Sequence, residues 1–137
     1  MILLPPDIAA ALRRNGRAAR EASAGDRAGP DPVPLLKLFN PVGLAMWIAT
    51  ELGEDGDTLF GLADLGFGCP ELGYFSLTEI ANVRLPFGLR IERDLLFTGE
   101  QPLSIWADLA RRYGSILQAE FELRRAALTK LPPQKGG

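Results

Sequence analysis

Acidic side chains gather in the middle of the chain, with types and spacing that could bind a metal ion. If two strands end near one another, Asp64, Glu71 and Glu92 would lie close enough to ligate Mg²⁺ or Mn²⁺. A metal held in this way would support the hydrolysis of nucleic acid. The competing interpretation places these acids at exposed turns, with Glu92 paired to Arg93 within the sheet. We therefore expect no cofactor unless the three carboxylates converge on such an ion.

Other catalytic chemistries are excluded by composition. The sequence has no histidine, and Cys69 is its only cysteine. These counts exclude Ser-His-Asp and Cys-His mechanisms and zinc sites built from histidine or several cysteines. They also exclude an intrachain disulfide. Catalysis would have to use carboxylates, Lys, Arg, Tyr, Ser or Thr. We therefore expect a binding protein rather than an enzyme.

A glycine-rich acidic segment between two predicted strands is the expected interaction surface. It is not a phosphate loop, because Phe67 and Gly68 follow Gly66 where a P-loop needs Lys and Ser or Thr. The dinucleotide fingerprint also fails, since Glu71 stands at the position of its third glycine. The residues expected to form the surface are Asp64, Gly66, Gly68, Glu71, Leu72 and Tyr74.

A basic segment near the start of the chain raises the question of nucleic acid. Five arginines lie between Arg13 and Arg27 and could contact a phosphate backbone. The net charge is nevertheless −2, and aromatic residues make up only 8% of the chain. A sheet that binds single strands needs exposed aromatic side chains, for which Tyr74 and Phe75 are the candidates; one of the two must point into the core. We therefore expect a protein partner rather than nucleic acid, and no membrane.

The elements that position these residues follow from periodicity and turn signals. Pro5-Pro6-Asp7 begins a helix with a predicted C-cap at Asn15-Gly16, and a further turn over Arg17–Glu21 is the alternative. Ser76 with Glu79 forms a capping box before a short helix that reaches about Val83. Ser104 would cap a helix that runs from about Ile105 to Leu128, with a kink or break at Gly114. Trp47 and Trp106 are the expected core anchors. The predicted strands are Leu35–Phe39, Leu44–Glu51, Thr58–Asp64, Gly73–Ser76 and Leu89–Phe97.

These elements predict an α+β fold, in which a mostly antiparallel sheet of four to five strands lies with an N-terminal helix, a short inserted helix and a C-terminal helix. The 137 residues are expected to form a single domain, with a mobile loop at 23–34 and a frayed tail at 130–137. The chain shows no signal-peptide pattern at its start, and together with its single cysteine this predicts a cytoplasmic location. The oligomeric state is open.

Several segments together resemble the bacterial domain-of-unknown-function family numbered 2958. They are LLPPDIAAALRRNG, LLKLFNP, the MWIATEL–GD–FGLADLG run, PELGYFSLTEI and GLRIERDLLF, and the resemblance covers roughly residues 2–115. PELGYFSL and IERDLLF are the most specific pieces. Members of this family tend to sit on plasmids and integrated mobile elements, so the resemblance implies an accessory role there. It supplies no catalytic residues.

Two functions remain in competition. The first is a non-catalytic accessory protein of mobile elements that acts through protein or weak nucleic-acid contacts at the Asp64–Tyr74 segment. The alternative is a metal-dependent nuclease that uses Asp64, Glu71 and Glu92. The positions of these three carboxylates decide between the two, because a single metal needs its ligands within about 2.0–2.6 Å.

Overall fold

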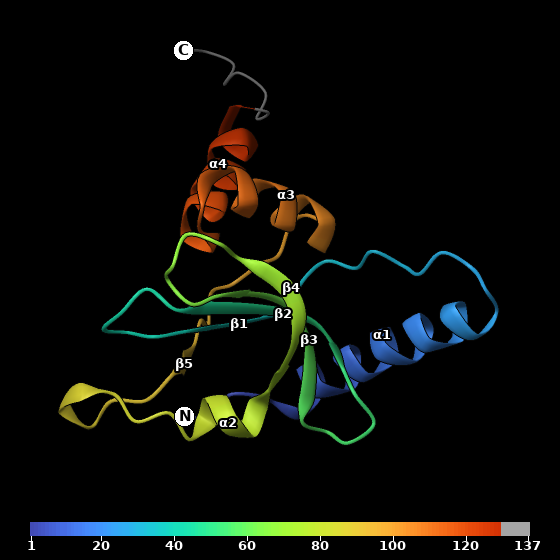
Figure 1. Ribbon diagram of the computed structural model, residues 1–137, viewed down its shortest axis with the longest axis horizontal. Coiled ribbons are helices and arrows are strands. Elements are labelled where there is room, and N and C mark those ends of the chain that lie inside the picture. The colour runs from blue at the N-terminus through green and yellow to red at the C-terminus, as the bar shows by residue number, and fades with distance from the viewer. Residues whose placement is uncertain (130–137) are drawn as a thin grey trace, which may run out of the picture.

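The computed structural model describes residues 1–129 as three layers, with one antiparallel sheet between two layers of helices (Figure 1). The sheet has five strands in the order β4-β3-β2-β1-β5. The α+β class predicted from the sequence is confirmed. The elements are α1 (Pro6–Ala24), β1 (Leu36–Phe39), β2 (Met46–Leu52), β3 (Thr58–Asp64), β4 (Glu71–Ser76), α2 (Leu77–Ala81), the 3-10 turn η1 (Pro86–Gly88), β5 (Glu92–Arg93), α3 (Leu103–Tyr113) and α4 (Ile116–Thr129).

The two faces of the sheet support separate hydrophobic cores. Alternation along β3 sends Leu59 toward α1 and α2, and Leu62 toward α3 and α4. Trp47 anchors the first core and Trp106 the second, and both are buried as expected. Each helical layer therefore has its own apolar contact with the sheet.

A buried lysine links the sheet to the helical layer of α3 and α4. Lys37 on β1 is 6% exposed, and its Nζ lies 3.0 Å from both carboxylate oxygens of Glu120 on α4. Asp94, just after β5, is 3.2 Å away. A buried ammonium must be paired, because its desolvation is costly. This pairing fixes α4 to the sheet.

The prediction that α1 ends at Asn15-Gly16 is wrong, because the helix continues to Ala24. The Asn15 side chain donates to the Thr50 carbonyl oxygen, 3.0 Å away. Gly16 is buried against the backbone of Leu52, so that a Cβ at this position would lie 2.6 Å from the Leu52 carbonyl oxygen. The glycine is therefore a close-packing site between α1 and β2 rather than a helix terminus.

The predicted strand Leu89–Phe97 is also too long, since only Glu92 and Arg93 pair with β1. The chain turns immediately afterwards, where the Asp94 carboxylate accepts from the amide of Leu96 at 3.0 Å. The other strands agree with prediction to within two residues at their ends, and Thr58–Asp64 agrees at both ends.

The helices after β4 match the sequence in part. Ser76 Oγ accepts from the Glu79 amide at 3.1 Å, which confirms one half of the capping box, although α2 ends at Ala81. Ser104 does not cap α3: the cap is Pro102, and the Ser104 amide and hydroxyl instead donate to Asp31. Gly114, with φ 80, ends α3 and breaks the predicted C-terminal helix in two.

Two sequence expectations concern the ends of loops and of the chain. The predicted loop 23–34 begins only after Ala24. The predicted tail 130–137 lies outside the described residues. Among residues 1–129, no helix has both the length and the hydropathy that a membrane span requires.

Replacement of Gly16 by alanine tests the contact between α1 and β2. Helix propensity alone would stabilise the protein by about 1 kcal/mol. The clash with the Leu52 backbone should outweigh this gain and lower the free energy of unfolding by about 1–3 kcal/mol. Urea denaturation measures the difference, and a more stable Gly16→Ala variant would show that the contact is looser than described.

Candidate functional site

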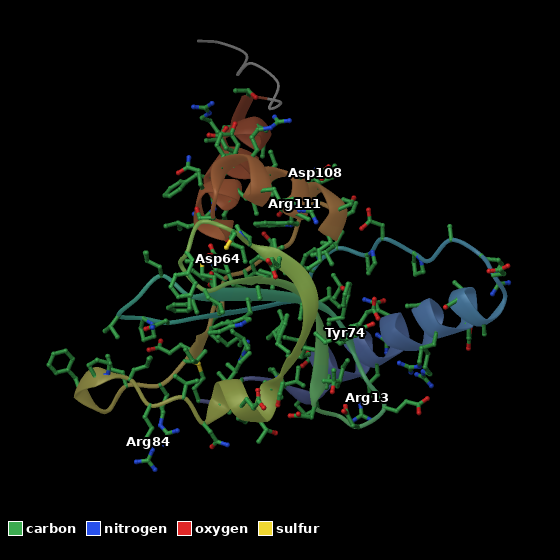
Figure 2. All side chains as sticks on the ribbon, viewed as in Figure 1. Arg13, Asp64, Tyr74, Arg84, Asp108 and Arg111 are labelled. Carbon is green, nitrogen blue, oxygen red and sulfur yellow. The ribbon has the colours of Figure 1, made fainter. Side chains whose placement is uncertain are left out.

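Asp64, the first of the predicted metal ligands, is occupied by backbone donors. Its side chain is 3% exposed, at the end of β3 beneath the C-terminal helices (Figure 2). Oδ1 accepts from the Gly66 amide and Oδ2 from the Ile116 amide, both at 2.9 Å. The carboxylate thus satisfies the first turn of α4 and holds the β3–β4 loop beside it.

The three predicted ligands do not converge. Glu71 begins β4 at one edge of the sheet, and Glu92 lies in β5 at the other edge. Four strand spacings separate these edges, about 19 Å at 4.8 Å per spacing. Asp64 and Glu71 also face opposite sides of the sheet, because Glu71 pairs with Ala63. Within the part of the chain that the structure describes, no group of three Asp, Glu, Cys or His residues could hold a metal ion.

The loop between β3 and β4 has the glycine geometry expected from its sequence. Gly66 and Gly68 have φ values of 90° and 82°, which other residues rarely adopt. Between them Phe67 is 82% exposed, and Leu65 is 57% exposed. The glycines therefore display apolar side chains rather than cradle a phosphate.

Strand β4 lies at an edge of the sheet, and no strand within residues 1–129 pairs with its outer side. Leu77 N–H donates to the Asp57 carbonyl oxygen, and hydrogen-bonded pairs alternate along an antiparallel ladder. The backbone groups of Gly73 and Phe75 therefore face β3, while those of Leu72 and Tyr74 face outward. Within residues 1–129, neither outward-facing residue makes a backbone hydrogen bond beyond the ladder.

As expected, the neighbouring aromatic residues Tyr74 and Phe75 of β4 point to opposite faces of the sheet. Phe75 packs against the α1-side core, whereas Tyr74 is 75% exposed (Figure 2). The Tyr74 ring lies 5.0 Å from that of Phe60, tilted by 53°. Leu72, 39% exposed, lies on the same face as Tyr74. An apolar strip therefore runs beside the free edge.

A bulge in β2 adds a residue that the sequence did not single out. Thr50 and Glu51 together oppose Phe60, so the register shifts and Glu51 joins the face of Phe60 and Tyr74. Burial raises the pKa of Glu51, and the nearby Arg20 guanidinium partly opposes this rise. No sequence signal marks a bulge here, because the run MWIATEL contains neither glycine nor proline.

Two small hollows meet at Glu51 and Phe60 and extend the strip into a groove. One, of about 150 Å³, is also lined by Arg20 and Tyr74. The other, of about 160 Å³, reaches Asp31 and Leu72. We call this surface the β4 groove. It combines aromatic and aliphatic walls with the carboxylates of Glu51 and Asp31.

A second aspartate fixes the far end of β4. Asp57, before β3, accepts from the Ser76 hydroxyl at 2.6 Å, the Thr78 hydroxyl at 2.5 Å and the Thr78 amide at 2.7 Å. These donors hold the pKa of Asp57 below its ordinary value. The hydroxyl and amide of Thr58 lower the pKa of Asp55 to about 2.

A family model described as a protein of unknown function, DUF2958, matches residues 3–117. The chain belongs to this family. The match covers every strand and the site just described, and stops at the start of α4. Neither a curated protein nor a solved structure matches the chain. The family assigns no function to its members, so the function has to be argued from the geometry of the β4 edge.

Replacement of Asp64 by asparagine tests its structural role. Asparagine offers one acceptor oxygen where two amides need one each, so a buried amide would face the NH₂ group. We expect the free energy of unfolding to fall by about 1–3 kcal/mol. Thermal melts with and without Mn²⁺ measure this loss. A metal-dependent rise in the wild-type melting temperature that disappears in Asp64→Asn would contradict the structural role and restore the metal site.

The hydrogen bonds of Asp55 and Asp57 predict acid sensitivity. A carboxyl whose pKa is lowered by folding stabilises the protein above its unfolded pKa, and this stabilisation is lost as the pH falls through the folded value. For Asp55 the window runs from its ordinary value of 3.8 down to about 2. We expect the melting temperature to fall across this window, and to fall less steeply in Asp57→Asn than in wild type.

Melts of the control Glu54→Gln, at an 84% exposed side chain, should follow the wild-type curve. An Asp57→Asn curve that ran parallel to wild type would show that these hydrogen bonds do not hold the end of β4.

Proposed function

We propose that this protein is a non-catalytic accessory protein of bacterial mobile elements, cytoplasmic, that binds a protein partner by adding an extended segment of it to β4. The observation that carries the binding mode is the free outer edge of β4, with outward backbone groups at Leu72 and Tyr74. An unpaired edge strand is a ready template for another strand. The role in mobile elements rests on the family resemblance.

The edge is suited to recognition as well as to pairing. Backbone hydrogen bonds give affinity in strand addition, whereas alternate side chains of the added strand give specificity. Here every second side chain of the partner would lie beside Leu72 and Tyr74, and Phe60 lies one strand further in on the same face. Exposed aromatic side chains at such positions are frequent binding hot spots.

The charges of the β4 groove favour a particular partner sequence. Glu51 and Asp31 line it, and the guanidinium of Arg20, which also lines it, lies 3.7 Å from Glu54. A partner strand that alternates apolar and basic residues would complement this lining. These carboxylates would repel the phosphate groups of a nucleic acid, so the groove favours a protein partner. The nuclease alternative loses its support because its three carboxylates lie apart.

Charge placed at the edge should remove the partner. Tyr74→Lys and Leu72→Lys place in the apolar strip the charge that a basic partner segment carries, so the yield of a partner recovered from host cells with the wild-type protein should fall at least about tenfold. Quantitative mass spectrometry after affinity purification measures the recovery. Phe121→Lys is the matched control, because Phe121 is 54% exposed on α4 and away from the edge.

Cross-linking then tests the mode of binding. A photoreactive residue at position 74 should attach to alternate residues of one extended segment of the partner, whereas the same group at position 121 should not. Loss of the partner in all three lysine variants, or its retention in Tyr74→Lys and Leu72→Lys, would contradict binding at β4.

A further inference from the structure

The loop before β5 carries at its tip an aromatic side chain that is almost fully exposed. Phe87 is 93% exposed, at the tip of a loop that projects beyond the sheet on the side of β5 (Figure 1). Its φ is 63°, and that of Gly88 is 72°. Leu89 N–H donates to the Pro86 carbonyl oxygen, which closes a tight turn with positive φ at both central residues. Asn, Asp or Gly normally fills the first of these positions, so phenylalanine here is strained as well as exposed.

The surroundings of Phe87 are apolar and basic. Arg84 and Arg90 flank the tip, and Arg84 points away from the body of the protein (Figure 2). Arg90 is tied back by a hydrogen bond to the Ala81 carbonyl oxygen at 3.2 Å. After β5, Leu95 and Leu96 are 65% and 90% exposed. This side of the molecule therefore exposes several large apolar side chains near one edge strand, which is the signature of an interaction surface.

A hollow of complementary character lies on the same side. It has a volume of about 410 Å³ and lies between the segment after β5 and α4. Its walls are mainly apolar, from Leu96, Trp106, Leu123 and Leu128. Its charged side chains are Glu100, Glu120 and Arg124, and Glu120 is already paired with Arg124 and Lys37. Its volume lies in the range of sites that enclose small ligands, so an aromatic ring fits within it.

We propose that Phe87 of one copy of this protein inserts into this hollow of a second copy, and the reverse, to form a two-fold symmetric dimer. Phe87, which we call the knob, lies in the loop before β5, and the hollow is lined in part by the segment after β5. Both therefore lie at one edge of the sheet. A two-fold axis beside that edge brings each knob to the other copy's hollow. Arg84 beside Phe87 would meet Glu100 of the hollow, because Glu120 is already paired with Lys37 and Arg124. This contact is separate from β4, which lies at the opposite edge.

The strained turn supplies a variant that separates binding from folding. Phe87→Asn places a residue suited to positive φ at the tip, so the melting temperature of the monomer should be unchanged or higher. The dimer dissociation constant should nevertheless rise at least about 30-fold, because a central aromatic anchor is lost. Analytical ultracentrifugation over the micromolar range measures the constant. Phe67→Asn, at the other highly exposed phenylalanine, should leave it unchanged.

Mixing two monomeric variants tests the reciprocal geometry. Ala127→Trp fills the hollow from an exposed position on α4 and should also abolish the dimer. In a mixture with Phe87→Asn, the Ala127→Trp chain still carries a knob and its partner still carries an open hollow. Heterodimers should therefore form with one of the two contacts. A wild-type protein that stays monomeric, a Phe87→Asn variant that dimerises normally, or a mixture without heterodimers would overturn the proposal.

Discussion

The outward edge of this sheet depends on two aspartates, one at each end of β3. Asp64 ends the strand and accepts from the amides of Gly66 and Ile116, so that the β3–β4 loop and α4 share one buried carboxylate. Asp57 precedes the strand and gathers the hydroxyls of Ser76 and Thr78. Together they fix where β4 begins and ends. Hydrogen bonds to a charged acceptor are stronger than neutral ones, which suits residues that must hold an edge strand in place.

The layers explain why the edges rather than the faces of the sheet are available. The α1 layer covers one face and the α3–α4 layer the other, and the buried Lys37 holds α4 down through Glu120. The two edges differ in character. The β5 edge pairs over only two residues and is flanked by exposed apolar side chains, whereas β4 offers six residues of regular strand. The longer edge suits strand addition, and the shorter one suits a contact between side chains.

Local signals predicted most of the fold, but not the carboxylate chemistry. Alternation identified Thr58–Asp64, and Ser76 was recognised as a helix cap from its spacing to Glu79. The end of α1 was wrongly predicted at Asn15-Gly16, because the sequence does not distinguish a glycine that ends a helix from one that allows a neighbouring strand to pack closely. The separation of Glu71 from Glu92 depends on strand order, which is set by pairing between distant segments. The face of the sheet on which Glu51 lies could not be predicted, because it depends on the bulge in β2.

Hydrogen exchange of the individual β4 amides measures whether the outer side of this strand is free to pair. In the isolated protein the amides of Gly73 and Phe75 face β3 and should exchange slowly. Those of Leu72 and Tyr74 face outward and should exchange at rates close to those of an unstructured chain. At concentrations where the protein is monomeric, slow exchange at Leu72 and Tyr74 would show that the edge is already covered and would contradict the account.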